Sequence, residues 1–359
     1  MRLEPGGRIA VTDAAVVGRL LDEYHERSIP PADFRLVSGS VHETRVTYKV
    51  ALSGGSAHLI RAFRADELIP VHGRGLTSMT MADWLVGKAR TLGYLAAVGY
   101  PAPRPVRSRT GELIGVAGPW LSWATTYVPG ETLSPTHEQL RLLGAALGTL
   151  HSLPISTDGT RAGLGSRHPD IAIPPTLSRL DGVAHLVPPD LRDMHATFRR
   201  CAETVRDLAA SVPEAIVHGD AWARNAVQDK SGAVTLIDWE AGGVGLAVQD
   251  LGNFLLECHL DSGLPDDQPA LWLVMPHERR IAAAAEGYAS VRTLSDAELD
   301  LLPAAVMFTA AVVGAIHLEA ALTSGVAGSS MDARLARLRN RVAVAEEVAA
   351  LARPHLVRS

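Results

Sequence analysis

Apolar and polar positions alternate along three short segments near the start of the chain, at residues 34–37, 44–50 and 57–63. Alternation with a period of two is typical of strands with one buried face, and glycines between the segments favour tight turns. This pattern therefore predicts an antiparallel sheet. Apolar residues at helical spacing predict one helix before the sheet, at residues 13–26, and another after it, at residues 81–97.

Further along, the pattern becomes mostly helical. Two more strand-like runs, at residues 105–107 and 120–127, complete the first part of the chain, and Pro129-Gly130 marks the change. Beyond it, the spacing of apolar residues predicts helices at residues 139–151, 191–210 and 331–352, and a long apolar helix opened by Pro303.

Two segments of the second part need separate interpretation. Residues 156–189 are rich in Pro, Gly and Ser and are expected to form a long loop or insertion. The longest apolar run, residues 304–316, is too short to span a membrane and is interpreted as a buried helix. We therefore expect an α+β chain with a small sheet-containing part at residues 1–128 and a larger, mostly helical part at residues 129–359.

Composition narrows the class of protein. With 47% hydrophobic and 20% charged residues, the chain is expected to be globular. A net charge of −5 argues against a nucleic-acid partner, which would favour a basic face. The two distant cysteines, Cys201 and Cys258, predict core filling in a reducing cytoplasm. The first residues lack an apolar signal region, so we expect no membrane partner, while the oligomeric state stays open.

Two carboxylates and a carboxamide stand close together between residues 216 and 240. Residues 226–228 and 233–237 are strand-like runs around a turn, which predicts an antiparallel hairpin. Asn225 precedes the first strand and Asp238 follows the second, so both are expected at the open end of the hairpin. The loop that carries Asp220 leads into the same corner.

Such a corner suits phosphoryl transfer, in which catalysis is mostly positioning and electrostatic stabilisation. Mg²⁺ prefers oxygen ligands, and Asn225 and Asp238 supply a carbonyl and a carboxylate. Asp220 precedes Asn225 by the spacing of a kinase catalytic loop, in which an Asp accepts the proton of the attacking hydroxyl. The alternative is that these residues are ordinary turn formers, but their combination with the hairpin favours chemistry.

The segments His218–Asn225 and Ile237–Glu240 resemble the signature of the aminoglycoside phosphotransferase and choline kinase-like family. Weaker resemblances follow in the family's order within residues 35–320: Gly99–Pro103, Tyr127–Gly130, Leu150–Pro154 and Gln249–Leu251. The resemblance implies a two-lobed protein-kinase-like fold. It also implies an O-phosphotransferase that uses Mg²⁺ and ATP, bound between the lobes, to phosphorylate a hydroxyl of a small molecule. GTP stays open as an alternative nucleotide.

Within that family the Asp after the Gly handles the acceptor hydroxyl, which assigns this role to Asp220. The resemblance makes His218 a structural residue that holds the loop, and Glu240 a support of the metal site. Trp222 is expected either to stack on a substrate ring or to pack under the loop.

The nucleotide side departs from the family. The turn Ser38-Gly39-Ser40 could lay its N–H groups over phosphates, or be a plain hairpin turn. The family's Lys on the third strand is replaced by Arg61, which should contact phosphates unless it lies in solvent on an edge strand. The next helix lacks the family's Glu, so either Asp83 pairs with Arg61 or the pair is absent. Adenine is expected near the backbone of Thr125 and Tyr127.

The acceptor side is acidic in sequence. Residues 255–300 contain nine acids, Glu257 and Asp261 among them, against three bases. This would suit a cationic acceptor such as an aminoglycoside or another antibiotic, or it is a solvated helical surface. Two alternative functions remain: a metabolic kinase for a sugar, amino alcohol or choline-like acceptor, and a non-catalytic, pseudokinase-like nucleotide-binding module.

Overall fold

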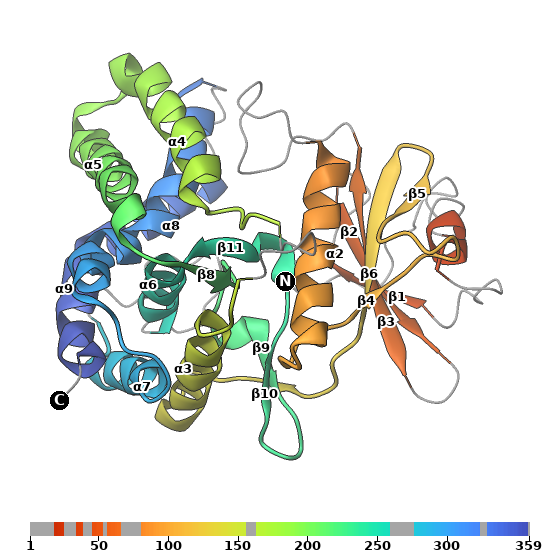
Figure 1. Cartoon of the computed structure of the whole chain (residues 1–359). Coiled ribbons are helices and arrows are strands. Elements are labelled where there is room, and N and C mark those ends of the chain that lie inside the picture. Colours follow the sequence, from red (N-terminus) through yellow and green to blue (C-terminus); the bar gives the residue numbers. More distant parts are fainter. Residues whose placement is uncertain are drawn as a thin grey trace. The chain divides into compact units, whose positions relative to one another are not determined.

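The computed structural model describes residues 18–24, 34–38, 45–52, 56–65, 80–155, 163–258, 276–323 and 329–357. The chain divides into two compact units (Figure 1). The first comprises Met1–Pro129 with Ser156–Gly163, and the second comprises Gly130–Ile155 with Leu164–Ser359. Each unit is described by itself.

The first unit is built on an antiparallel sheet of strand order β1-β2-β3-β6-β4, with β5 paired to β6. The strands are β1 (Phe34–Ser38), β2 (Arg45–Ala51), β3 (Ala57–Arg64), β4 (Pro105–Val106), β5 (Gly115–Ala117) and β6 (Trp120–Thr126). Helix α2 (Met81–Ala97) contacts β6 and β4. The predicted antiparallel sheet and the predicted helix are confirmed. Of the first predicted helix, residues 18–22 are helical and residues 13–17, 25 and 26 lie outside the described part.

A buried tyrosine links the first helical segment of this unit to its sheet. Tyr24 donates its hydroxyl to Ser122 O at 2.7 Å and accepts from the Gly115 N–H at 2.8 Å. Burial raises the pKa of Tyr24 to about 12. Because both hydrogen bonds join the tyrosine hydroxyl to backbone atoms of the sheet, they fix residues 18–24 against β5 and β6.

The second unit is mostly helical, as predicted. Its helices are α3 (His137–His151), α4 (Pro169–Val183), α5 (Arg192–Leu208), α6 (Ala247–Cys258), α7 (Glu278–Ala289), α8 (Asp296–Thr323) and α9 (Ser329–Leu356). Short 3₁₀ turns are η2 (Ala184–Leu186), η3 (Pro189–Leu191), η4 (Ala209–Ser211), η5 (Ala223–Asn225) and η6 (Trp239–Ala241). The strands form two small antiparallel sheets: β7 (Glu131–Thr132), β9 (Ala226–Gln228) and β10 (Val234–Leu236) in one, and β8 (Glu214–Val217) and β11 (Gly243–Leu246) in the other.

Helix α8 is the centre of this unit and contacts α4, α5, α6 and α9. By length and composition it could cross a membrane, but 72% of its most apolar window is buried inside the protein. The expected burial is therefore confirmed, whereas the expected start at Pro303 was wrong, since the helix runs from Asp296 to Thr323. Pro303 lies inside it and does not open it. Proline cannot donate to the carbonyl four residues earlier, and Arg353 of α9 bonds that carbonyl, Leu299 O, at 2.9 Å instead.

The expectation of a loop over residues 156–189 was also wrong, because α4 fills much of that range. Pro174 and Pro175, which contribute to the proline content of this range, both lie within the helix. Pro169 occupies the first turn, where proline needs no hydrogen bond, and the His168 side chain accepts from the Asp170 N–H. Contact with α8 and α5 gives α4 apolar burial that sequence composition does not reveal.

Helices α3 and α7 approach each other closely through glycines. A Cβ atom at Gly144 would lie 2.3 Å from Ala284 O, and one at Gly287 would lie 2.1 Å from Arg141 O. Backbone cannot yield easily at such distances, so the contact requires glycine at both positions.

We predict that Gly287→Ala lowers the free energy of unfolding by about 1–3 kcal/mol, because the added methyl group forces the helices apart. The control is Gly182→Ala in α4, where a Cβ atom meets nothing within 4 Å. That change should be neutral or stabilising by up to about 1 kcal/mol. Urea unfolding measures both, and equal stability of the two variants would contradict the close packing.

Candidate active site

The segment after β8 is held by one buried carboxylate. Asp250, in the first turn of α6, accepts the backbone N–H of His218 at 2.6 Å and that of Gly219 at 2.9 Å. Gly219 has φ +78°, and a Cβ atom there would lie 2.6 Å from Ala241 O. The loop can therefore follow this path only with glycine, and its direction is fixed just before Asp220.

His218 joins this loop to the end of the hairpin. Its buried ring donates from Nε2 to Ile237 O at 2.8 Å and accepts the Asp220 N–H at Nδ1, at 3.3 Å. The ring also packs edge-on against Trp239, with centroids 4.7 Å apart. Both ring nitrogens are occupied, so the contacts give His218 a scaffolding position and leave it no free nitrogen for a general base.

Two of the three residues expected in one corner, Asp220 and Asn225, are in direct contact, and Asp238 follows a residue whose N–H bonds to Asn225. Asn225 donates from Nδ2 to Asp220 Oδ2 at 2.8 Å and to Asp220 O at 2.9 Å. The backbone carbonyl of Asn225 accepts the Ile237 N–H at 2.8 Å, which fixes the residue before Asp238. The register of β9 with β10 confirms the predicted hairpin, with Leu236 opposite Ala226.

Asp238 has a special backbone conformation. Its φ of 65° and ψ of 62° are left-handed, and it is the one non-glycine residue with positive φ in the described ranges. Such a conformation costs roughly 1–2 kcal/mol and persists where its surroundings impose it. The surroundings of the turn after β10 therefore hold Asp238 in this conformation.

The donor set fits a hard divalent cation. Because Asn225 uses Nδ2 for Asp220, its Oδ1 is the atom suited to a metal, and Asp238 supplies a carboxylate. The described residues contain no group of three or more His, Cys, Asp or Glu that could hold a metal ion. A site of two protein oxygens completed by nucleotide phosphates is the arrangement typical of Mg²⁺.

A family model described as the phosphotransferase enzyme family matches residues 87–294. The chain belongs to this phosphotransferase family. A homoserine kinase of Methylorubrum populi is 27% identical over 224 residues, which cover 59% of this chain and 62% of that protein. The chain therefore matches less than two thirds of this relative's length.

Solved structures of the family share the fold. An amicoumacin kinase in complex with AMP-PNP, Ca²⁺ and Ami is 16% identical, with a TM-score of 0.62 over 96% of both chains. A spectinomycin phosphotransferase in complex with ADP and spectinomycin is 13% identical, with a TM-score of 0.58 over 93% of this chain and 98% of that one. These likenesses confirm the predicted α+β, protein-kinase-like fold.

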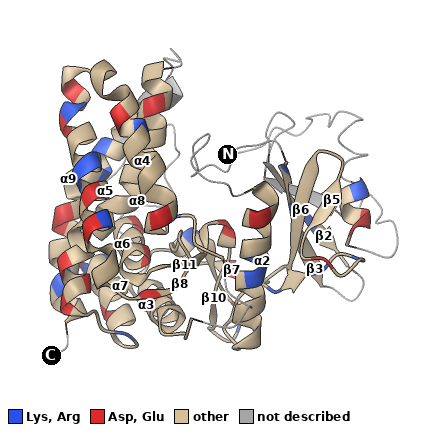
Figure 2. Ribbon diagram, turned by 45° about the horizontal axis from the view of Figure 1, so that its top comes forward, with Lys and Arg blue, Asp and Glu red and all other residues tan. Residues whose placement is uncertain are grey.

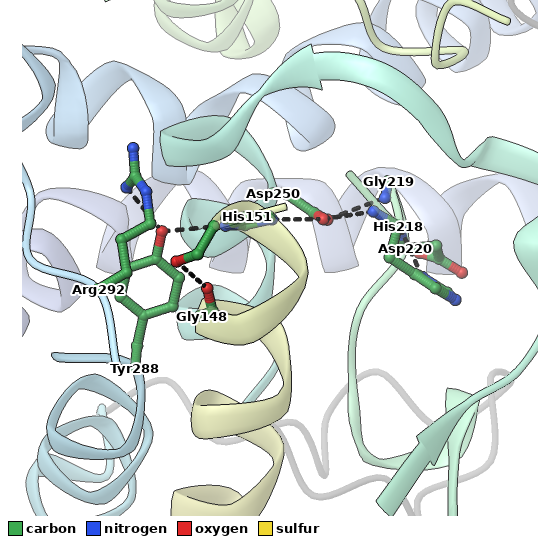
Figure 3. Close-up of polar contacts among 9 residues, drawn as sticks. Gly148, His151, His218, Gly219, Asp220, Asp250, Tyr288 and Arg292 are labelled. Atoms are coloured by element: carbon green, nitrogen blue, oxygen red, sulfur yellow. Dashed lines mark hydrogen bonds and ion pairs between the residues drawn. The ribbon is translucent and has the colours of Figure 1, made fainter. Parts of the chain in front are cut away.

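In this phosphotransferase-family chain, the Asp250 carboxylate that holds the loop also belongs to a chain of hydrogen bonds that runs through His151 and Tyr288 to Arg292 (Figure 3). His151 of α3 donates from Nε2 to Asp250 Oδ2 at 3.1 Å, and its Nδ1 lies 3.0 Å from the Tyr288 hydroxyl. Arg292 donates to the Tyr288 oxygen at 2.8 Å and to Glu298 Oε1 at 2.6 Å. Helices α3, α6, α7 and α8 are thereby joined through polar groups behind the loop.

The protons along this line have one consistent assignment. Burial lowers the pKa of His151, so its ring is neutral, accepts from Tyr288 and donates to Asp250. Burial alone would raise the pKa of Asp250, but its hydrogen bonds from His151 and the His218 backbone outweigh this, and the pKa is lowered. Burial raises the pKa of Tyr288, which keeps its proton. Asp250 is therefore ionised and every neighbour donates towards it.

Two residues of this site were not predicted from the sequence. Asp250 was noted only for its resemblance to a family motif, although an acid within the mostly apolar segment 244–256 indicates a buried carboxylate that needs partners. Arg167 was missed altogether, because its segment was interpreted as a loop. Its Nη2 lies 3.8 Å from Asp220 Oδ1.

The predicted phosphate-binding residues lie in the first unit. Arg61 is only 9% exposed on β3, between β2 and β6, with its guanidinium 5.7 Å from the Trp123 ring centroid. The alternative of a solvent-exposed Arg on an edge strand was therefore wrong. Asp83 accepts from the N–H and hydroxyl of Thr80 and closes the α2 cap. Lys88, near the family's Glu position, is buried, with Nζ 5.5 Å from the Trp84 ring centroid.

The remaining nucleotide-side residues are placed as follows. Ser38 ends β1, whereas Gly39 and Ser40 lie outside the described residues. Thr125 is buried in β6, and its hydroxyl has no hydrogen-bond partner among the described residues. The Tyr127 N–H is already donated to Ala57 O at 2.8 Å, so the expected adenine pairing cannot use it.

Several acids that were expected to line the acceptor site are paired with arginines instead. Glu257 is buried in an ion pair with Arg341 of α9, so we reassign it to helix packing, and Asp261 lies outside the described residues. Glu286 pairs with Arg141. Figure 2 shows acidic and basic residues interspersed along these helices.

Two further predicted residues belong to the loop and its turn. Trp222 is half-buried, with the Arg224 guanidinium 5.4 Å from its ring centroid. Glu240 lies in η6, and its carbonyl accepts from the Ser166 hydroxyl at 3.3 Å.

We predict that Asp250→Asn lowers the free energy of unfolding by about 3–5 kcal/mol, because it breaks a buried charged network. Amide exchange at His218 and Gly219 should accelerate more than elsewhere, since their acceptor is altered. The control is Asp193→Asn at an exposed position of α5. Loop amides as protected as in the unmodified protein would contradict this role.

Stability should also depend on pH through His151. Its folded-state pKa lies below the ordinary 6.5. Below about pH 6.5 the unfolded chain therefore binds a proton at this position that the folded protein does not bind. The free energy of unfolding then decreases as the pH falls, by up to about 1.4 kcal/mol per pH unit.

Urea unfolding between pH 7 and pH 5 tests this. His151→Gln should show a shallower loss, and His185→Gln, at an exposed position, should match the unmodified protein. The Asp250 contribution is lost only at lower pH, as its lowered pKa is reached. Equal slopes for all three proteins would show that His151 is not held neutral.

Proposed function

We propose that this protein is an O-phosphotransferase that moves the γ-phosphoryl group of a nucleoside triphosphate to a hydroxyl of a small molecule. One observation carries the proposal: Asp220 lies beside Asn225 on a loop whose backbone is fixed by Asp250, next to the strained turn that presents Asp238. Phosphoryl transfer depends on such fixed placement of charges.

Asp220 is the proposed acceptor of the hydroxyl proton. Its side chain is 41% exposed, so a substrate can reach it. Asn225 engages Oδ2 and orients the carboxylate, while each oxygen keeps further lone pairs for an incoming hydroxyl. His218 holds the loop in place.

Asn225 and Asp238 are the proposed ligands of Mg²⁺, and Glu240 would support them from the same turn. When bound with the nucleotide, the ion would neutralise charge on the phosphate oxygens. The complexes of family structures with AMP-PNP and Ca²⁺, and with ADP, support an adenine nucleotide and a divalent cation. GTP remains the alternative, and Arg61 with the turn after Ser38 is proposed to contact phosphates.

The acceptor is proposed to be a small hydroxylated metabolite of the amino-acid type, on the strength of the homoserine kinase relatives. Two of the acids expected to attract a cationic antibiotic are instead paired with arginines, as Glu257–Arg341 and Glu298–Arg292. This favours the metabolic alternative over an aminoglycoside acceptor.

We predict that Asp220→Ala lowers kcat by at least about 100-fold while leaving nucleotide affinity within about threefold, because general-base catalysis typically contributes 10²–10⁴-fold. ADP release measures the first quantity and isothermal calorimetry the second. Asp193→Ala is the control for loss of a carboxylate. Unchanged turnover would remove Asp220 from the mechanism, and nucleotide binding without turnover over a broad acceptor panel would indicate a binding module.

A further inference from the structure

Arg167 lies beside the proposed catalytic carboxylate of Asp220 but makes no hydrogen bond to it. Its Nη2 lies 3.8 Å from Asp220 Oδ1, beyond hydrogen-bond distance. Its side chain is only 19% exposed, and Nη1 is buried with no hydrogen-bond partner among the described residues. Guanidinium stays charged at every physiological pH, so these N–H groups need an acceptor.

The backbone around Arg167 is fixed on both sides. The Gly165 N–H bonds to Val244 O at 2.7 Å and the Ser166 N–H to Ala241 O at 3.0 Å. On the other side, the buried His168 ring lies 2.9 Å from Glu214 Oε1 of β8. Since β8 and β11 also flank the loop of Asp220, the backbone that carries Arg167 is fixed beside that loop.

The two residues beside the Asp220 carboxylate face different oxygens. Asn225 bonds to Oδ2, whereas Arg167 faces Oδ1. Arg167 therefore lies at the other edge of the carboxylate from Asn225, the proposed metal ligand. An acceptor whose hydroxyl reaches Asp220 would extend towards this edge.

We propose that Arg167 binds the carboxylate of the acceptor and makes the protein selective for short hydroxy amino acids over the corresponding amino alcohols. A planar guanidinium with two neighbouring N–H groups binds a carboxylate through two parallel hydrogen bonds. This inference rests on the proposed function and adds the group by which that site recognises its substrate class.

The test compares matched acceptors that differ only in the carboxylate: L-homoserine with 3-aminopropan-1-ol, and L-serine with ethanolamine. ADP release is measured for the unmodified protein, Arg167→Gln, Arg167→Lys and the control Arg206→Gln, an exposed Arg of α5. Thermal unfolding of each variant establishes that it is folded.

We expect Arg167→Gln to raise KM for the better amino acid by at least about tenfold, with kcat within about threefold. KM for the matched amino alcohol should not change. Arg167→Lys should be intermediate, because it keeps the charge but loses the paired hydrogen bonds. Arg206→Gln should behave as the unmodified protein. An equal loss of kcat on both members of a pair would overturn the proposal, since it would place Arg167 on the phosphoryl group or on Asp220.

Calorimetric binding of the same acceptors separates this inference from the proposed function. Absence of turnover with every acceptor would count against the kinase activity. A carboxylate-dependent affinity that Arg167→Gln removes would still support the binding role. Equal binding of amino acid and amino alcohol by the unmodified protein, or no binding of either, would overturn it.

Discussion

The proposed active site depends on the hydrogen bonds from the backbone N–H groups of His218 and Gly219 to the Asp250 carboxylate. Two N–H groups on one buried anion fix the direction of the chain just before Asp220. The anion is stabilised in turn by its place in the first turn of α6 and by the neutral ring of His151. Helices α3 and α7 pack closely, and the contact of His151 with Tyr288 links this packing to Asp250.

This construction matches the chemistry proposed for it. Transfer of a phosphoryl group needs fixed charges more than reactive ones, and a small displacement of a catalytic group is costly. Asp220 is oriented by Asn225, and Asp238 is presented by a left-handed turn. Family membership is shown by the family model, which matches residues 87–294.

Local pattern was enough to predict the antiparallel sheet, helix α2, the hairpin and the closeness of Asp220 to Asn225, because those residues are close in sequence or periodic. It failed where partners are distant. The bond from Arg353 that relieves Pro303, the pairing of Glu257 with Arg341 and the approach of Arg167 to Asp220 each join segments more than 45 residues apart. Helix α4 was missed because its prolines dominate local propensity, while its burial against α8 is a property of the whole unit.

Transfer of a phosphoryl group to carbon-bound oxygen can be observed by ³¹P nuclear magnetic resonance of a reaction containing the protein, ATP, Mg²⁺ and L-homoserine. We expect a phosphate monoester signal that grows in equal amount with ADP. ADP accompanied only by inorganic phosphate, or unchanged ATP with homoserine and with every other hydroxylated acceptor, would contradict it.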